Sequence, residues 1–204
     1  MANANVIEIE TCLKEALKFC EEHQDLEFIR FYHPRLERAK KQFEDAVKAS
    51  DLHWLQWQKE SQEDKIVWKH MANEYLAAQR ALVRQNAVGY PNVRVRHWDE
   101  EALLGYVEEM IAYLDEHKAD IEDAGVMSEK LQRLVGKALK ENKDESEAFK
   151  NYQRYATQRS NAFGVIGSAL WEFRGAMRRH YGKRNPTYLS IRWPMTLNSD
   201  ETVL

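Results

Sequence analysis

The sequence is poor in the residues that interrupt regular structure, with only eight glycines and four prolines among 204 residues. Its two cysteines are too few for a disulfide framework, and a chain of this length does not need disulfide bonds or metals to stabilise its fold. With 44% apolar residues it is also too apolar to be generically disordered. These scarcities exclude a stapled mini-protein and a disordered chain, and they leave a globular fold with a sizeable core.

Long hydrophobic runs are also lacking. No stretch approaches the roughly 18 consecutive apolar residues of a membrane span, and the first residues lack the basic and apolar regions of a secretory signal. Cys12 and Cys20 lie eight residues apart on one helical pattern, which separates them by about 12 Å and precludes a disulfide. We therefore expect buried thiols in a cytoplasmic protein that makes no membrane contact.

Helical periodicity dominates the pattern of apolar residues. One series predicts a first helix, and Pro34 fits the first turn of a second one. Ser50 or Asp51 can cap a third helix that runs to about residue 86. The second and third helices could also be fused, because no Gly or Pro separates them. The buried faces are predicted to contain Ile9, Leu13, Ala16, Leu17 and Cys20, then Leu36, Ala39, Phe43, Ala46 and Val47, then Ile66, Met71, Tyr75, Ala78 and Leu82.

After a break at residues 89–91, the alternation in residues 93–96 is typical of a short strand. A further helix is expected from about Asp99 to Asp123, with a stop at Gly125 and a restart at Ser128. The last helical pattern resumes by Glu147 and ends near Gly182.

The two halves of the chain resemble each other at an offset of 94–95 residues. The segment 13–23 (LKEALKFCEEH) aligns with 107–117 (VEEMIAYLDEH), and both contain an equivalent histidine, His23 and His117. Residues 91–98 align with 186–193, with Pro first and Trp eighth in each. We predict an all-α bundle of two tandem helical repeats of about 95 residues, 1–98 and 99–193. Each repeat ends in a short extended arm that could form a β-strand, and a tail follows at 194–204. The two repeats are expected to pack as one domain about a pseudo-twofold axis.

Charge is segregated along each repeat although the total is only −3. Residues 1–30 hold seven acids and three bases, and residues 99–125 hold ten acids and one base. The ends are reversed, because residues 80–98 hold four arginines and no acid, and residues 174–193 hold five arginines, one lysine and no acid. Complementation of helix dipoles accounts for part of this pattern. The remainder indicates contacts between an acidic face and a basic arm of the same or another subunit.

Sequence motifs of catalysis and of cofactor binding are missing. The seven histidines form neither a Glu-x-x-His nor a His-Glu-x-x-His pattern, and no Cys-x-x-Cys, phosphate loop or nucleophile elbow occurs. His70 and Glu74 could share a helix face, a spacing that arises often by chance. We therefore expect no enzyme, no cofactor and no metal.

Two segments stand out from the helical pattern. Gly164 and Gly167 lie inside the last helix, where glycine costs about 1 kcal/mol relative to alanine. Close approach of another helix or a ligand cavity would explain them. The segment 183–194 lacks a helical period yet carries large apolar side chains, so it is expected to pack over the bundle, to pair with residues 93–96 or to dock on a partner. Pairing is the first choice.

The sequence thus predicts a non-catalytic structural or protein-interaction protein that forms homo-oligomers. Its predicted contact residues lie in the two arms, since Arg and Trp are enriched at binding hot spots. A nucleic-acid binder is the alternative, and a bundle that binds a small molecule or a metal is the third hypothesis. The predicted contact residues are Arg94, Arg96, Trp98, Tyr188, Ile191, Arg192 and Trp193, and the anion or nucleic-acid candidates are Arg174, Arg178, Arg179, Lys183 and Arg184.

Overall fold

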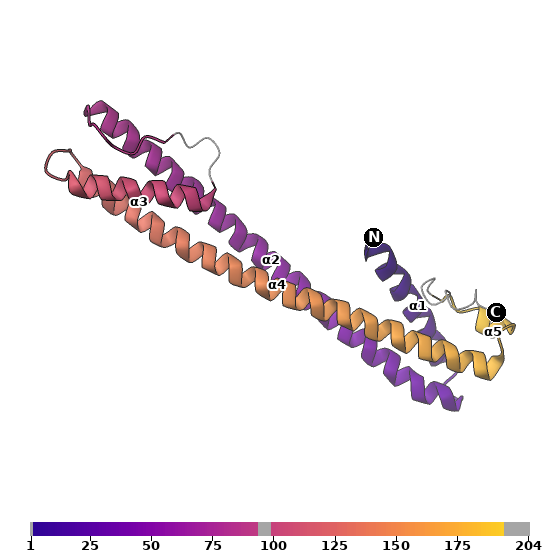
Figure 1. Ribbon diagram of the computed structural model, residues 1–204. Coiled ribbons are helices and arrows are strands. Elements are labelled where there is room, and N and C mark those ends of the chain that lie inside the picture. The colour runs from indigo at the N-terminus through magenta and orange to yellow at the C-terminus, as the bar shows by residue number, and fades with distance from the viewer. Residues whose placement is uncertain (1, 94–98, 194–204) are drawn as a thin grey trace. The chain divides into compact units, whose positions relative to one another are not determined.

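The structure is a computed structural model that describes residues 2–93 and 99–193 (Figure 1). Within these ranges the chain is mostly helical and has no strand, so the predicted all-α class is confirmed. None of the described helices has an apolar stretch long enough to cross a membrane. The helices are α1 (Ala2–Glu22), α2 (Glu27–Arg84), α3 (Glu100–Glu116), α4 (Ala124–Tyr181) and the single turn α5 (Pro186–Leu189).

The helices assemble into two compact units. Unit 1 combines residues 1–53 with residues 152–204, and unit 2 is residues 54–151. The long helices α2 and α4 therefore contribute one part to each unit. Because unit 1 takes residues from both ends of the chain, the compact units differ from the repeats predicted along the sequence. The division into those repeats stays a prediction.

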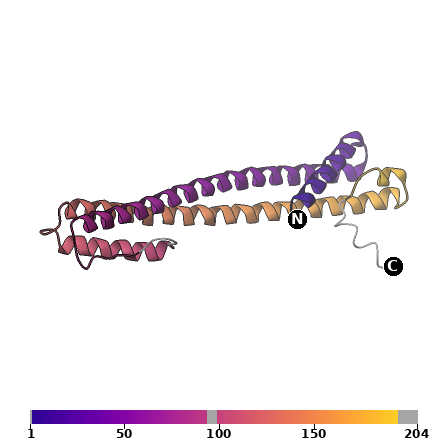
Figure 2. The same ribbon diagram turned by 90° about the horizontal axis from the view of Figure 1, so that it is seen from above.

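Unit 1 is built from α1, the first part of α2, the last part of α4 and α5, as the two ribbon views show (Figure 2). Cys12 and Cys20 are free and fully buried, as predicted. Burial raises the pKa of the Cys12 thiol to about 11 and that of the Cys20 thiol to about 12. The two long-helix segments run antiparallel, because their contacts are Arg35–Glu172, Phe43–Phe163 and Asp51–Arg159.

Unit 2 packs α3 against the last part of α2 and the first part of α4. Leu103, Val107, Met110 and Leu114 recur every three to four residues on α3 and are fully buried. Asp99 caps this helix, since its side chain accepts a hydrogen bond from the Ala102 amide. The long-helix segments again run antiparallel, with contacts Trp57–Glu145, Glu74–Lys130 and Gln85–Glu122.

Helix α2 is continuous, so the second and third predicted helices are fused, which the sequence had left open. Ser50, the expected cap, lies inside α2 and is buried. The prediction for Pro34 is wrong as well, since it is the eighth residue of α2 and not in the first turn. Proline removes one backbone hydrogen bond there. Burial of Ile29 and Leu36 on either side keeps the helix in place.

The second connection also differs from the prediction. Helix α3 ends at Glu116 and not near Asp123, and Gly125 lies inside α4 instead of stopping a helix. The turn is made at Asp123, which has a positive φ of 60°. Ser128 does not restart the helix: its buried hydroxyl donates to Asp115 at 2.7 Å. Hydrogen bonds from Lys118 and from this hydroxyl hold the pKa of Asp115 below its ordinary value.

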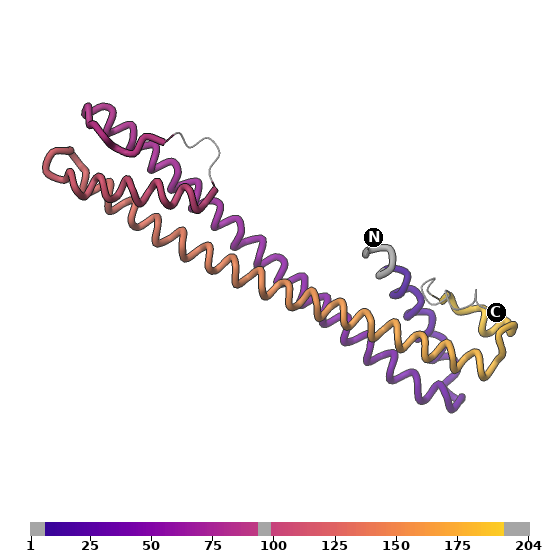
Figure 3. Tube along the Cα trace, in the orientation of Figure 1, coloured from indigo at the N-terminus to yellow at the C-terminus, as the bar shows by residue number. Residues whose placement is uncertain are grey.

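The C-terminal segment was expected to be extended, but it contains α5, which follows the end of α4 in the tube drawing (Figure 3). Asn185 caps this turn by accepting from the Thr187 amide at 2.8 Å, and Pro186 begins it. Gly182 ends α4 with a φ of 85°, close to the predicted end. The predicted pairing of this segment with residues 93–96 rests on residues 94–96, which lie outside the described residues.

Candidate functional site

Three predicted contact residues of the C-terminal segment belong to the core of unit 1. Tyr188 and Ile191 are buried, and Trp193 packs against the same core cluster. The Trp193 ring lies 6.1 Å from that of Phe173, and its indole donates to the Tyr188 carbonyl at 3.4 Å. This segment therefore packs over its own bundle, the alternative that ranked below pairing, and little of these side chains is left for a partner.

The other predicted contact residues are placed differently. The Arg192 side chain is exposed, while its backbone amide donates to Glu15 at 2.7 Å. Arg94, Arg96 and Trp98 lie outside the described residues. Among the predicted contact residues that the structure describes, Arg192 is therefore the exposed one.

The candidate anion-binding residues gather at the end of α4 in unit 1. Arg178, Arg179, Lys183 and Arg184 are exposed. Arg174 is half-buried and donates to the Tyr188 hydroxyl at 2.9 Å, so it holds the C-terminal segment in place. The cations on α4 itself also complement the negative end of the helix dipole.

The glycines of α4 are not explained by close packing between helices. A Cβ atom added to Gly164 or Gly167 would meet nothing within 4 Å, so the predicted close helix approach is wrong at both positions. Gly164 instead lies on an open groove of about 570 Å³ between α2 and α4 of unit 1, together with Ser168 and Val165. We call this the glycine groove. The predicted ligand cavity beside the glycines thus corresponds to an open groove and not to an enclosed pocket.

The opposite wall of the glycine groove is basic and polar. It carries Arg35, Arg38 and Gln42 from α2. Arg35 forms an ion pair with Glu172 at 3.0 Å and lies over the Phe31 ring at 4.1 Å. Arg38 is exposed and forms no ion pair with any described residue. The groove therefore offers one guanidinium group to an anionic partner.

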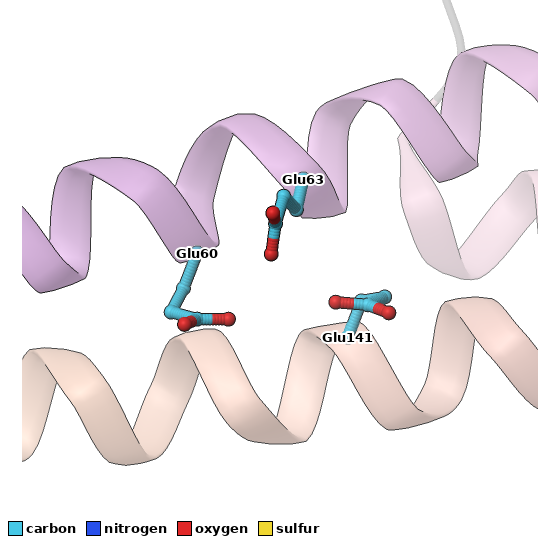
Figure 4. Close-up of side chains that lie close together, drawn as sticks. All are labelled: Glu60, Glu63 and Glu141. Carbon is cyan, nitrogen blue, oxygen red and sulfur yellow. The ribbon is translucent and has the colours of Figure 1, made fainter.

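A different surface lies on unit 2, where three carboxylates converge. Glu60 and Glu63 extend from α2 and Glu141 from α4 into the space between these helices (Figure 4). One carboxylate oxygen of each lies within 4.8 Å of the other two. Lys59 is the nearby cation, at 3.9 Å from Glu60 and 3.5 Å from Glu63. Among the described residues this is the one group of three or more potential metal ligands.

Further carboxylates continue this cluster along the helices. Asp64 accepts from the Trp68 indole at 2.9 Å, and Glu145 accepts from the Trp57 indole at 2.7 Å. Desolvation by burial raises the pKa of Asp64, and the charges of Glu145 and Glu141 add to the rise. We use the name acidic seam for the carboxylates between α2 and α4 of unit 2: Glu60, Glu63, Asp64, Glu141 and Glu145.

Glu100, the first residue of α3, lies next to the acidic seam. Its carboxylate accepts from the Asn142 side chain at 3.2 Å. Burial raises the pKa of Glu100, and the charges of Asp64 and Glu145 raise it further. Burial is thus the first cause of the raised pKa of both Asp64 and Glu100, and the charges of neighbouring carboxylates are the second.

Aromatic side chains lie on the same helix faces as the acidic seam. Trp57 precedes Glu60 by three residues on α2, and Phe149 follows Glu145 by four on α4, so each pair shares a face. The Trp57 ring lies 4.9 Å from that of Trp54 and 5.1 Å from that of Phe149. Exposure is 38% for Trp54, 36% for Phe149 and 61% for Leu55. We call Trp54, Trp57 and Phe149 the aromatic face of unit 2, and the exposed Leu55 lies on another side of α2.

His70 and Glu74, which the spacing placed on one helix face, are in contact in unit 2. His70 is exposed, with Nε2 3.5 Å from a Glu74 oxygen. The other oxygen of Glu74 pairs with Lys130 at 2.7 Å, and this contact links α2 to α4. Glu74 thus lies between His70 on its own helix and Lys130 on α4.

Sequence reasoning missed the acidic seam and the aromatic face. A signal was present, because Glu60 and Glu63 on one helix and Glu141 and Glu145 on the other recur at spacings of three and four residues. Which helix faces meet could not be read from those spacings. No family model, curated protein or solved structure matches the chain, so the geometry of these surfaces is the guide to its function.

Proposed function

We propose that this chain is a non-catalytic structural protein that binds other proteins and self-associates through charged and aromatic helix faces. The observation that carries the proposal is the exposure of Trp54, Leu55 and Phe149 beside the acidic seam of unit 2. Large aromatic residues at the surface are enriched in protein interfaces, and nearby charges select the partner.

Light scattering of the full chain over a range of concentrations and salt tests this proposal. We expect the mean mass to exceed that of the 24.1 kDa monomer at low salt and to fall as salt rises. A monomer under every condition would contradict self-association. Replacing Trp54 and Leu55 by alanine is expected to lower the mass with little change in unfolding temperature, because both side chains are exposed.

Nucleic-acid binding is the second candidate, favoured by the exposed cations Arg178, Arg179 and Arg184 at the end of α4. Phosphate contacts by such residues would give binding that weakens steeply with salt. Fluorescence anisotropy with a labelled DNA duplex tests it. A monomer that binds the duplex with steep salt dependence would favour this function over self-association.

We also propose that the chain arose by internal duplication into the repeats 1–98 and 99–193. Two features of the structure support this. A short helix precedes a helix of 58 residues in each half. At the end of each short helix a histidine Nδ1 contacts the carbonyl four residues earlier, at 3.0 Å for His23 and 2.9 Å for His117. Each ring also stacks on an aromatic neighbour, at 4.1 Å on Phe19 and 4.3 Å on Tyr113.

A further inference from the structure

A hollow of about 330 Å³ lies in unit 2 between the last part of α2 and the first part of α4. Its floor is formed by Ala78 and Leu131, which are 3% and 1% exposed and belong to the core cluster of this unit. Ala77 and Ala81 line it on the α2 side, and Val126 lines it on the α4 side. The interior is therefore apolar. We call this hollow the alanine slot.

The alanine slot exists because α2 presents small side chains there. Ala77 and Ala81 lie four residues apart, and Ala78 lies three residues before Ala81, so the three share one side of the helix. A leucine or methionine at any of these positions would extend into the empty space. Pockets for small ligands in proteins have volumes of about 300–1,000 Å³. The slot is therefore large enough for a small molecule.

Contacts between α2 and α4 bridge the alanine slot at both ends. At one end the Lys130 ammonium lies 2.7 Å from a Glu74 oxygen. At the other end the Gln85 side chain donates to the Glu122 carbonyl at 3.2 Å and accepts from the Glu122 amide at 3.0 Å. Glu74 and Gln85 are eleven residues apart on α2, which corresponds to about 16 Å. The slot is thus elongated, apolar along its length and polar at its ends.

The two ends of the alanine slot differ in charge. At the first end Glu74 and Lys130 neutralise each other. At the second end Glu122 and Asp123 are exposed and form no ion pair with any described residue. Helix α4 begins directly after these two carboxylates, but its dipole supplies only about half a positive charge. Uncompensated negative charge therefore remains at one end, where a cation would be attracted.

The chemistry of the alanine slot selects one class of ligand. A positive group gains from the carboxylates of Glu122 and Asp123, and an unbranched apolar chain is removed from water between Ala81 and Met127. An anion would be repelled at the charged end. A metal ion would leave the apolar walls uncovered, and the carboxylates that converge on one point lie elsewhere, in the acidic seam.

We propose that the alanine slot of unit 2 binds a small organic cation, a linear primary amine or guanidine, with its charged head beside Glu122 and Asp123. The apolar chain of the ligand then lies along Ala77 and Ala81. All lining residues belong to one unit of one chain, so this inference does not depend on the proposed self-association. It gives unit 2 a ligand site in addition to its proposed contacts with proteins.

Titration calorimetry of the full chain with hexylamine tests the proposal. This probe combines a positive charge at neutral pH with an unbranched chain. We expect saturable binding of one molecule per chain, which weakens as salt is added. Hexanoate has the same chain length and the opposite charge, so it should not bind. Ethylamine keeps the charge but has a shorter chain, so it should bind at least about tenfold more weakly than hexylamine.

The methyl group of Met127 reports where hexylamine binds. Met127 lines the alanine slot and is half-buried, whereas Met71 and Met110 are fully buried in the core of unit 2. In a methyl-selective NMR spectrum we expect the Met127 signal to move during the titration more than the signals of Met71 and Met110. Shifts of Met71 and Met110 that equal or exceed that of Met127 would overturn the assignment to the slot.

Two variants remove the two features that define the alanine slot. Glu122→Gln with Asp123→Asn removes both charges but keeps the backbone contacts to Gln85, and asparagine tolerates the φ of 60° at position 123. Ala81→Leu fills the slot with a residue that is also a good helix former. Each variant should weaken hexylamine binding at least about tenfold, and circular dichroism should show unchanged helicity.

Matched controls carry the same kinds of change outside the alanine slot. Glu116→Gln with Asp120→Asn removes two charges at and after the end of α3, and Ala112→Leu adds a leucine at an exposed position of α3. None of these three residues lines the slot. Both controls should bind hexylamine like the wild type. A control that weakened binding as much as its matched variant would overturn the assignment.

The remaining results also decide the proposal. It is overturned if hexylamine shows no saturable binding, if hexanoate binds as tightly, or if neither slot variant changes the affinity. A lysine side chain of a partner protein has the same chemistry as a free amine, and Nα-acetyl-lysine methylamide distinguishes the two sources. Tighter binding of this blocked lysine than of hexylamine would assign the slot to a protein segment and overturn the assignment to a small molecule.

Discussion

Both units are antiparallel segments of α2 and α4 covered by a short helix, yet they fill the space between the long helices differently. In unit 1 that space holds aromatic contacts, Phe43–Phe163 at 6.0 Å and His53–Tyr155 at 4.0 Å. In unit 2 the part next to unit 1 along the sequence holds the carboxylates of the acidic seam, and the rest holds apolar side chains such as Trp68, Met71 and Leu134. Apolar side chains stabilise a helix pair by burial, whereas crowded carboxylates oppose it. The difference indicates that unit 2 gives up apolar packing along the acidic seam and keeps it over the remainder of α2 and α4.

The largest effects are expected from truncating the core of each unit. Phe173 is fully buried in unit 1 and Met110 is fully buried in unit 2. Phe173→Ala should cost about 3–5 kcal/mol of unfolding free energy and Met110→Ala about 2–5 kcal/mol. Hydrogen exchange then tells whether the units are stabilised separately. We expect Phe173→Ala to speed the exchange of amides in α1 and Met110→Ala to speed that of amides in α3. Loss of exchange protection in both helices from either substitution would contradict this.

A smaller loss of unfolding free energy is expected from removing the polar contacts that hold the segment after α2. The Gln79 amide is buried and lies 3.1 Å from the Pro91 carbonyl and 3.2 Å from that of Val93. Gln79→Ala removes the donor to the Val93 carbonyl, while the Pro91 carbonyl keeps the Tyr75 hydroxyl at 3.2 Å, and it should cost about 1–3 kcal/mol in denaturant unfolding.

The corresponding contact in unit 1 is the hydrogen bond from Arg174 to the Tyr188 hydroxyl. Tyr188→Phe should cost only about 1 kcal/mol, because the half-buried guanidinium can be hydrated instead. A larger loss from Tyr188→Phe than from Gln79→Ala would reverse the comparison.

Gly164→Ala should increase stability. The added methyl group meets no described atom, and alanine is favoured over glycine in a helix by about 1 kcal/mol. Thermal unfolding measures the gain. Gly89→Ala is the comparison variant with the opposite expected effect. Gly89 has a φ of 79° that alanine adopts only with strain, so we expect this substitution to lower the stability of the fold. A loss of stability from Gly164→Ala would show that the groove is closed by packing that requires glycine.

The acidic seam should make unit 2 the pH-sensitive part of the molecule. Burial raises the pKa values of Asp64 and Glu100 above the ordinary 3.8 and 4.5, so the folded state binds these protons more tightly than the unfolded state. These two groups should therefore make stability rise as pH falls from neutral through their raised pKa values, whereas Asp115, whose pKa is lowered, acts in the opposite direction as pH falls below its ordinary 3.8. The stabilisation from Asp64 and Glu100 is fully present below their ordinary pKa values and is lost as pH rises through their raised pKa values.

Asp64→Asn keeps an oxygen that can accept from Trp68 but removes the charge. It should raise the unfolding temperature at neutral pH and reduce its dependence on pH. Asp51→Asn in unit 1 is the control, because Asp51 is exposed and its ion pair with Arg159 spans 3.7 Å. It should change stability by less than about 0.5 kcal/mol. If Asp51→Asn changed the unfolding temperature and its pH dependence as much as Asp64→Asn does, the pH response would not arise in the acidic seam.

Much of the fold could be predicted from the sequence because helical periodicity is a local property. The buried faces of α1 and α3 follow it closely. Ile66 shows the limit, since it was predicted to be buried and is 66% exposed. The face that turns inward on α2 is defined by Trp68, Met71 and Tyr75, and Ile66 is out of phase with it. The apolar character of one residue does not fix the phase of a helix.

Element boundaries were harder to predict because they depend on contacts distant in sequence. Ser50 has the chemistry of a cap, but burial keeps it inside α2. Ser128 likewise hydrogen-bonds to Asp115 across the connection. The acidic seam could not be predicted for the same reason. The proximity of Glu60 to Glu141 depends on how α2 pairs with α4, which the spacing of residues along one helix does not show.

The sharing of α2 and α4 between the units has a consequence for how the chain emerges from the ribosome. Unit 2 is one continuous stretch, and its contact between Trp57 and Glu145 spans 88 residues. Unit 1 is closed by contacts such as Arg35–Glu172 and Glu15–Arg192, which span 137 and 177 residues. Contacts between distant residues form slowly because a long loop must close first. During synthesis unit 2 can therefore complete its core while the first 53 residues still await the last segment of the chain.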